Sequence, residues 1–373
     1  MIDHTVLLGG AEYSLECLVK GMDSTRYRYT VVLPGPGPFA DRLNALGVSV
    51  DYMRVDSWRW WVRTIRQRLK FFATIPYQVA NLIRWIKYLK KKKPDIIHFN
   101  INRLVEPVIA AKILGIPSVM HFRDIPSRID QKFILGMKGF YWLMGMADIW
   151  IANSKSTYDD INCNFDRKTI EVPNGVDLSL YSSRSIKHHK DEDSKITVAM
   201  IALLVPWKNH IGLLKVISLV TNQYKNIVFL IVGEGDKGYS NKLQEQITEY
   251  GIEEYVKLTG YVDNIPNLLS SVDILIHTTE REPFGRVFIE AMSACKPVVA
   301  FDSGGAAEIV VNGETGILVP KGEIGKMAEE ISSLINNPDM REQMGKAGRT
   351  RVEKYYTIDK HCQKVAEIYN DLL

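Results

Sequence analysis

Short apolar runs that alternate with helical segments along the whole chain are the feature that most constrains the fold. Each run is apolar throughout, which is typical of parallel strands buried on both faces of a sheet. Strands that alternate with helices predict parallel sheets covered by helices, so the sequence predicts an α/β protein. The predicted strands are residues 29–33, 96–99, 118–122, 149–152, 196–203, 227–232, 256–259, 274–276, 297–301 and 316–319.

The chain is long enough for two domains with separate hydrophobic cores, because it has 373 residues, of which 46% are hydrophobic. Residues 182–195 (SSRSIKHHKDEDSK) have the composition of a polar linker. The acidic residues inside it are interpreted as solvated rather than metal-binding, because no flanking strand would hold them rigid. We therefore predict an N-terminal domain at 1–181, a C-terminal domain at 196–355 and a terminal helical segment at 356–373. The apolar face of the terminal helix consists of Val365, Ile368, Tyr369 and Leu372.

Charge is unevenly distributed along the chain. Residues 1–180 contain 25 Lys and Arg against 17 Asp and Glu, whereas the remaining residues contain 22 against 26. A basic half predicts an anionic surface or ligand as its partner. The 4 scattered cysteines lack metal-ligand spacing, which indicates a reducing compartment. Because there is neither a signal peptide nor an apolar run of the ~20 residues that span a bilayer, we expect a cytoplasmic protein.

The N-terminus reaches its first glycine turn early. Met1–His4 runs almost at once into Gly9-Gly10. A first buried strand is normally longer, so we interpret this one as truncated.

The segment around EPFGRVFIEAM carries the strongest functional signal. A strand ends near residue 276, Pro283 and Gly285 break the chain, and a helical composition follows. Open α/β sheets bind ligands at the carboxyl ends of their strands, and free N–H groups at a helix start favour phosphates or hydroxyls. Glu282 at the turn and Glu290 in the helix can each accept hydrogen bonds from sugar hydroxyls. The alternative is a capped helix flanked by two surface glutamates.

A second glycine turn weakens that alternative. The predicted strand 297–301 runs into Asp302-Ser-Gly-Gly-Ala-Ala-Glu308, so both turns fall on the same edge of one sheet. Two such turns together favour a ligand site at this edge.

The motif Glu282-x7-Glu290 resembles the signature of family 4 retaining glycosyltransferases, which have the GT-B fold. The agreement extends over nearly the whole chain, and each further match is weak by itself. These matches are Gly9-Gly10-Ala11-Glu12, Val172–Asp177, Lys208, Gly233-Glu-Gly235 and Gly304-Gly305 with Glu308. The resemblance implies two Rossmann-like domains that face each other across a central cleft, with the C-terminal helix packing back on the N-terminal domain.

The resemblance also implies roles for individual residues. Glu290 would bind the ribose, Glu282 with the backbone of Phe284, Gly285 and Arg286 would hold the donor sugar, and Lys208 would neutralise the diphosphate. Gly9 and Gly10 would let the backbone approach the diphosphate, while Tyr261 and Val262 would hold the base. His121 would lie near the reacting centre, with Arg123 and Asp124 as weaker candidates, whereas His98 is interpreted as a packing residue. No metal and no cofactor are implied, since Lys208 and helix dipoles replace a cation.

The sequence departs from the family pattern at one position. The family often has an arginine five residues before the lysine, and Leu203 stands there instead. A departing diphosphate without a metal needs cationic or dipolar stabilisation, so this substitution leaves the rate of transfer open.

A second segment of functional interest extends from Trp58 to Lys93. It contains 11 basic residues, eight aromatic residues and no acidic residue. One predicted helix has an apolar face of Trp61, Ile65, Leu69 and Phe72, and a second has Leu82, Trp85, Ile86 and Leu89. Three interpretations remain: a packed helix pair with a solvated basic face, an anionic-membrane site, or a nucleic-acid surface, which is disfavoured because no nucleic-acid motif accompanies the charge. The predicted membrane-binding residues are Trp58, Arg59, Trp61, Arg63, Arg66 and Lys70.

These observations together predict a retaining glycosyltransferase. It would transfer a sugar from a nucleoside-diphosphate sugar, with UDP or GDP, to a membrane-associated, lipid-linked or glycan acceptor in polysaccharide or glycolipid biosynthesis. The enzyme would be cytoplasmic or peripheral on the inner face of the plasma membrane. The alternatives are a sugar-nucleotide epimerase on the same fold and a catalytically weak sugar-nucleotide-binding protein on the membrane surface.

Overall fold

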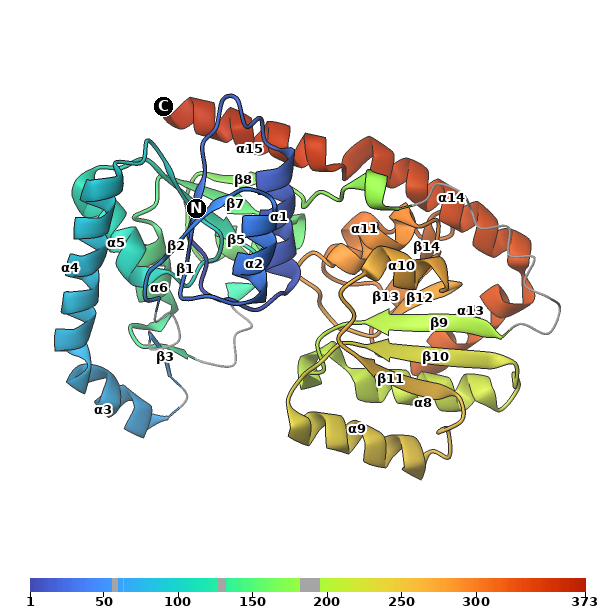
Figure 1. The fold of residues 1–373 in the computed structure, drawn as a ribbon. Coiled ribbons are helices and arrows are strands. Elements are labelled where there is room, and N and C mark those ends of the chain that lie inside the picture. The colour runs from blue at the N-terminus through green and yellow to red at the C-terminus, as the bar shows by residue number, and fades with distance from the viewer. Residues whose placement is uncertain (56–59, 63, 127–131, 182–194) are drawn as a thin grey trace. The chain divides into compact units, whose positions relative to one another are not determined.

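The structure, a computed structural model, describes residues 1–55, 60–62, 64–126, 132–181 and 195–373. The chain divides into two compact units, the first made of Met1–Gly175 and Ile358–Leu373 and the second of Val176–Thr357 (Figure 1). Each unit is built on parallel strands covered by helices, which confirms the predicted α/β class. The predicted linker at 182–195 lies outside the described residues except for Lys195. Among the helices that the structure describes, none is both long and apolar enough to cross a membrane.

The first unit has a parallel sheet in which Ile2 takes a central place. Ile2 forms parallel bridges to Val32 on one side and to Phe99 on the other, so it joins a pair of strands to a group of four. The pair is β1 (Thr30–Leu33) with β2 (Ser49–Tyr52). The four, in order, are β4 (Ile97–Phe99), β5 (Ser118–Phe122), β7 (Ile149–Ala152) and β8 (Thr169–Glu171).

Alternate strand residues of the first unit point to opposite helical layers. In β5, Val119 packs with α1 (Gly10–Gly21), α2 (Pro38–Ala45) and α15 (Ile358–Leu372). The neighbouring Met120 packs instead with the second layer. That layer consists of α4 (Ile75–Lys92), α5 (Val105–Leu114), α6 (Gly136–Met144) and α7 (Lys155–Asn162).

The predicted terminal helix is confirmed as α15, which contacts α1 of the same unit. Val365, Ile368 and Tyr369 are buried in the core shared with α1, and Leu372 packs against its edge. The amphipathic pattern therefore identified the buried face correctly.

The basic segment forms two helices, but the apolar face predicted for the first one is wrong at Trp61 and Phe72, two of its four residues. Trp61 belongs to a short strand, β3 (Trp61–Val62), which pairs antiparallel with β6 (Lys132–Phe133). α3 (Ile65–Ala73) begins after Thr64, whose side chain forms a capping box with Gln67. Within α3, Phe71 is buried and Phe72 is 60% exposed. In α4 the predicted face is confirmed, with Trp85 and Leu89 buried and Leu82 and Ile86 packed against the core.

The second unit has one six-stranded parallel sheet with the order β11-β10-β9-β12-β13-β14. The chain starts at the central strand β9, moves outward to one edge, then returns to β12 on the other side of β9. This reversal makes the carboxyl ends of β9 and β12 a topological switch point, where open α/β sheets bind ligands. The strands are β9 (Ile196–Ile201), β10 (Ile227–Val232), β11 (Val256–Gly260), β12 (Ile274–His277), β13 (Val298–Phe301) and β14 (Gly316–Val319).

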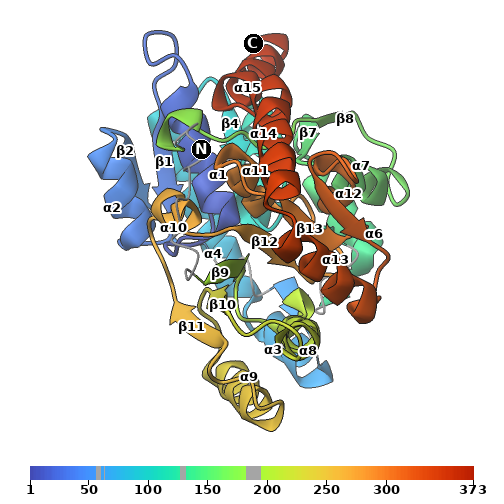
Figure 2. The same ribbon diagram turned by 90° about the vertical axis from the view of Figure 1, so that its right-hand side faces the viewer.

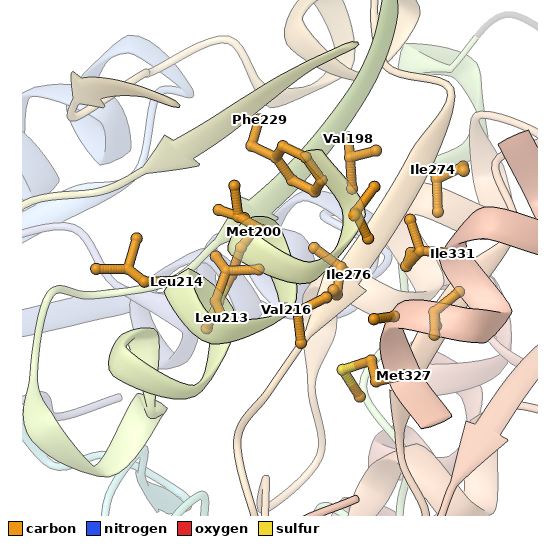
Figure 3. Close-up of a cluster of buried hydrophobic side chains, with 14 of the residues drawn as sticks. Val198, Met200, Leu213, Leu214, Val216, Phe229, Ile274, Ile276, Met327 and Ile331 are labelled. Carbon is orange, nitrogen blue, oxygen red and sulfur yellow. The ribbon is translucent and has the colours of Figure 1, made fainter. Parts of the chain in front are cut away.

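Two helical layers cover this sheet, and neighbouring strand residues point to different layers. Val198 and Met200 of β9 pack with α8 (His210–Thr221), α9 (Lys237–Glu249) and α13 (Ile324–Asn336), as Figure 3 shows for α8 and α13. Ala199 packs with the opposite layer of α10 (Ile265–Ser270), α11 (Arg286–Ser293) and α12 (Gly305–Ile309). Figure 2 shows α8 and α9 on one side of β9 to β11 and α10 on the other. α14 (Pro338–Tyr355) follows α13 and contacts α11.

Candidate functional site

The candidate site in the second unit lies at the carboxyl ends of β9 and β12. After β9 the chain forms a short 3-10 helix, Pro206–Lys208, and Asn209 in the left-handed region then begins α8. The hydroxyl of Thr278, just after β12, donates to the carbonyl oxygen of Asn209 at 2.9 Å. The two turns are therefore joined, and Lys208 is held beside the end of β12.

Lys208 and Glu282 form a partly buried ion pair. Lys208 Nζ lies 2.5 Å from Glu282 Oε2, and the two side chains are only 10% and 13% exposed. The ammonium group also lies 4.2 Å from the centre of the Trp207 ring, where a cation is attracted to the aromatic face. The pair therefore fixes one positive and one negative group at the switch point.

His277 completes this arrangement from the end of β12. Its Nε2 lies 4.0 Å from Glu282 Oε2. Burial, reinforced by the positive charge of Lys208, holds the pKa of His277 well below its usual range. His277 is therefore neutral at physiological pH, and Lys208 is the cation that balances Glu282.

The two adjacent glycines of the second turn hold the backbone of Glu282 in place. Gly305 N–H donates to the Glu282 carbonyl oxygen at 2.8 Å, and Gly304 forms a parallel bridge with Glu282. A Cβ on Gly304 would lie 2.3 Å from that carbonyl oxygen, and a Cβ on Gly305 would lie 2.0 Å from the carbonyl oxygen of Phe284. Only glycine permits this close approach, so the motif found in the sequence has a direct structural reason.

The first turn of α11 lies directly after Glu282. Gly285 precedes the helix with φ of 85°, and a Cβ there would lie 2.3 Å from the Phe288 ring. The first N–H groups of a helix have no partner within it and favour anions or hydroxyls. Arg286 and Glu290, one turn apart on α11, lie 3.3 Å apart as an ion pair with both side chains mostly buried. The predicted residues from Glu282 to Glu290 therefore share one turn and one helix.

Leu203 occupies the position where the family pattern has an arginine. It lies between β9 and Lys208, and its side chain is 54% exposed. The loop around it is packed tightly, because a Cβ on Gly233 or Gly235 would lie 2.0 Å from the carbonyl oxygens of Ala202 and Leu204, respectively. The glycines thus fix the path of the chain while leaving the Leu203 side chain at the surface.

Tyr261 and Val262 follow the edge strand β11, which is separated from β9 by β10. Tyr261 is 43% exposed, and its hydroxyl donates to Asp263 Oδ1 at 3.2 Å. The structure places both residues at the carboxyl side of the sheet, at its edge.

In the first unit, Gly9 and Gly10 lie at the start of α1. Gly9 is the residue before the helix, and a Cβ there would lie 2.8 Å from Glu12 Oε2. Burial, together with the nearby carboxylate of Asp3, raises the pKa of Glu12 to about 7. The glycine loop thus packs directly on a buried acidic side chain.

Asp3, His4 and Glu12 offer ligand atoms within 4.8 Å of one another, the one such group among the residues that the structure describes. Both oxygens of Asp3 already accept hydrogen bonds. Oδ1 accepts from the backbone N–H of His4 at 2.5 Å, and Oδ2 accepts from the side-chain amide of Asn100. These partners satisfy Asp3 without an ion.

His121 lies in β5 and is fully buried. Its Nδ1 lies 3.3 Å from Nε2 of His98 on the neighbouring strand β4. Arg123, just beyond β5, donates to the side chains of Asn100 and Asn174 at 2.8 and 2.7 Å. Asp124 pairs with Arg103 at 2.9 Å. The packing interpretation of His98 was therefore incomplete, because its imidazole also contacts His121.

The predicted membrane-binding residues are described only in part. Trp58, Arg59 and Arg63 lie outside the described residues, and Trp61 is described only as part of β3. Arg66 and Lys70 are exposed on α3. Beside them lie exposed apolar side chains: Phe72, which was predicted to be on an apolar face, and Ile75, Val79 and Ile83, which the sequence reasoning missed.

Sequence reasoning also missed three side-chain contacts that support the sites. Thr278 anchors the Lys208 turn, His277 lies against Glu282, and Tyr369 contacts His98. The first two had a detectable signal, since polar residues directly follow a predicted strand. Tyr369 had none, because its contact joins residues far apart in the sequence.

Comparison with known proteins identifies the family. Residues 8–180 match the family described as Glycosyltransferase Family 4, and residues 182–351 match the family described as Glycosyl transferases group 1. The chain belongs to glycosyltransferase family 4. The resemblance drawn from Glu282, Glu290 and the glycine turns is therefore confirmed. Family 4 enzymes are retaining and metal-independent.

Two curated relatives and one solved structure show the range of similarity. The capsular polysaccharide biosynthesis glycosyltransferase CapM of Staphylococcus aureus is 29% identical, over 50% of this chain and 49% of that protein. The UDP-Gal:alpha-D-GlcNAc-diphosphoundecaprenol alpha-1,3-galactosyltransferase of Escherichia coli is 24% identical, over 88% of this chain and 87% of that protein. The crystal structure of Anabaena Alr3699/HepE in complex with UDP-glucose has a TM-score of 0.83 and 26% identity, covering 100% of this chain and 98% of that one. The likeness confirms the predicted GT-B fold.

Proposed function

We propose that this family 4 glycosyltransferase transfers a sugar from a UDP-sugar to a lipid-linked or glycan acceptor at a membrane surface. The observation that carries the proposal is the Lys208–Glu282 pair, held 2.5 Å apart at the switch point of the second unit. A cation that receives a diphosphate and a carboxylate that receives sugar hydroxyls are the groups that a nucleotide-sugar site needs.

The donor would be held by the residues around this pair. Lys208 would exchange part of its contact with Glu282 for the diphosphate, and Glu282 would then accept from the donor sugar. The backbone N–H groups at Phe284, Gly285 and Arg286 would support the same sugar, because they lie at the start of α11. Glu290 would bind the ribose. The remaining roles are those implied by the family. Tyr261 and Val262 would hold the base. In the first unit, Gly9 and Gly10 would let the backbone approach the diphosphate, and His121 would lie near the reacting centre.

UDP is favoured over GDP as the donor nucleotide. The support comes from Anabaena Alr3699/HepE, which has been crystallised with UDP-glucose and is similar over the whole chain. A lipid-linked acceptor is supported by the Escherichia coli relative, whose name specifies a diphosphoundecaprenol-linked sugar. The CapM name supports a place in polysaccharide biosynthesis.

The donor site is tested by turnover of a panel of UDP- and GDP-sugars. We expect release of UDP from at least one donor, and a fall in kcat/KM of about tenfold to a hundredfold in Lys208→Ala and in Glu290→Ala, because each loses hydrogen bonds that involve a charged group. Lys237→Ala, an exposed lysine on α9, is the matched control and should behave like the wild-type protein.

The outcome of this experiment distinguishes the alternatives. Retention at the anomeric carbon of the product, read by NMR, supports transfer, whereas an epimerised nucleotide sugar would support an epimerase. If the protein binds a UDP-sugar in a thermal-shift assay but turns none over with any acceptor, the weak binding protein is favoured. Failure to bind any nucleoside-diphosphate sugar would overturn the proposal.

A further inference from the structure

Three buried side chains of the first unit form a hydrogen-bonded row. The Tyr369 hydroxyl on α15 lies 2.7 Å from His98 Nδ1 on β4. His98 Nε2 lies 3.3 Å from His121 Nδ1 on β5. The three residues are 2% exposed or less, so water does not compete for these contacts. Tyr369, which lies 271 positions after His98 in the sequence, is thereby connected to His121 through His98.

Each of the two imidazoles carries a single N–H. Burial holds the pKa of His98 and of His121 well below the usual range, and the positive charge of Arg123 acts in the same direction. A neutral imidazole has one donor nitrogen and one acceptor nitrogen. The direction of the hydrogen bonds along the row therefore decides which nitrogen of His121 carries the proton.

The Tyr369 hydroxyl determines that direction. Within the part of the chain that the structure describes, this hydroxyl has His98 Nδ1 as its hydrogen-bond partner. If His98 donated to the hydroxyl oxygen, the phenolic hydrogen would be buried without an acceptor, which is unfavourable. The favoured order is therefore Tyr369 O–H to His98 Nδ1, followed by His98 Nε2–H to His121 Nδ1.

This order places the proton of His121 on Nε2. That nitrogen is buried and has no hydrogen-bond partner among the described residues. A buried polar group without a protein partner is a position where a ligand can complete the hydrogen bonding. In the reverse order, Nε2 would instead present a lone pair and could act as a base.

We propose that Tyr369 acts through His98 to fix His121 as the Nε2–H tautomer, so that His121 offers substrate a hydrogen-bond donor and does not accept a proton. Tyr369 and His98 are thus positioning residues. The identity of the ligand as a sugar substrate rests on the proposed function, whereas the tautomer is a property of the protein alone.

The tautomer is measured by NMR on protein labelled with 15N in histidine, since protonated and bare imidazole nitrogens differ in chemical shift. We expect His98 and His121 both to be protonated on Nε2. In Tyr369→Phe the donor at the start of the row is lost, so both imidazoles should become tautomer mixtures. Tyr29→Phe is the matched control, because the Tyr29 hydroxyl is also buried and has no hydrogen-bond partner within the described ranges.

Kinetics provide a second measurement on the same variants. We expect kcat of Tyr369→Phe to fall about threefold to tenfold with the donor KM nearly unchanged, as for the loss of one neutral hydrogen bond. Tyr29→Phe should retain the wild-type rate. His98→Phe, which keeps a ring in this position, should also give His121 as a tautomer mixture and lower the rate.

Two results would overturn this proposal. One is protonation of His121 on Nδ1 in the wild-type protein, and the other is an unchanged 15N pattern in Tyr369→Phe. Absence of any sugar transfer with the expected tautomers present would contradict the proposed function and leave the tautomer assignment standing.

Discussion

Leu203 is an exposed apolar residue in the turn between β9 and Lys208. An arginine there would add a second cation beside the proposed diphosphate position, and a guanidinium can bind a phosphate through two parallel hydrogen bonds. We expect Leu203→Arg to fold normally and to raise kcat/KM for the nucleotide sugar by about tenfold. Steady-state kinetics check this change.

Leu219→Arg is the control for that prediction. Leu219 is 45% exposed on α8, so the variant adds the same charge at a similar exposure away from the Lys208 turn. Equal kinetics in the two variants would show that position 203 has no special relation to the donor.

Gly304 tests whether the backbone of the turn matters by itself. Its φ of 56° is strained for other residues, and an added Cβ would lie 2.3 Å from the Glu282 carbonyl oxygen. We expect Gly304→Ala to lower the free energy of unfolding by more than about 2 kcal/mol and to weaken donor binding. In Gly313→Ala the φ of 79° is also strained but nothing lies within 4 Å of the new Cβ, so the loss should be about 1 kcal/mol. Similar losses in both variants, measured by chemical denaturation, would contradict the role of close approach.

At the scale of elements, α3 and α4 combine exposed cations with exposed apolar side chains. Arg66 and Lys70 lie on α3, whereas Ile75, Val79 and Ile83 recur every four residues on α4 and are 43–49% exposed. A pair of neighbouring helices that presents both kinds of side chain suits an anionic membrane surface. This arrangement supports the membrane interpretation for the described part of the segment.

We expect the double variant Arg66→Gln and Lys70→Gln to bind vesicles containing anionic lipid about thirtyfold more weakly at low salt, since each basic residue near such a surface contributes about 1 kcal/mol. Co-sedimentation with vesicles measures the binding. Lys237→Gln with Lys242→Gln on α9 removes the same charge from another exposed helix and should have no effect. Binding that does not depend on anionic lipid would reject this surface.

The sequence predicted the buried strands better than the exposed ones. All ten predicted runs are strands in the structure, within about three residues at their ends. Four described strands were missed: β2 and β8 are only partly buried and lack a continuous apolar run, and β3 and β6 have two residues each. The burial of Phe71 was also missed, and so was the short strand that places Trp61 outside α3.

The candidate site was predictable where its residues are close in sequence. Glu282, Gly285 and Glu290 share one turn and helix, and the pattern located them directly. The pairing of Lys208 with Glu282 depends instead on which strands are neighbours in the sheet. Sequence spacing alone does not fix that order.

At the scale of the whole molecule, Glu12 links stability to pH. Its pKa is about 7 in the folded protein, raised from 4.5 by burial and by Asp3. Between these values the folded state holds more protons than the unfolded state, so this group makes the free energy of unfolding decrease as pH rises from about 4.5 to 7. Above pH 7 the buried carboxylate is ionised and its full cost, about 3 kcal/mol, is present.

We therefore expect Glu12→Gln to gain stability relative to the wild-type protein between pH 5 and pH 8, by up to about 3 kcal/mol. Chemical denaturation at both pH values measures the difference. Glu253→Gln, at an exposed position, should differ from the wild-type protein by the same free energy of unfolding at pH 5 and at pH 8. A constant difference for Glu12→Gln would contradict a raised pKa.

The return of α15 to the first unit affects how the protein is made. Proteins emerge from the ribosome N-terminus first, and domains generally fold as units during synthesis. The second unit is continuous from Val176 to Thr357 and can fold as soon as it has emerged. The first unit instead needs Ile358–Leu373, whose Val365, Ile368 and Tyr369 fill its core. Its apolar surface around α1 therefore stays uncovered until α15 has been synthesised, which happens only after the whole second unit.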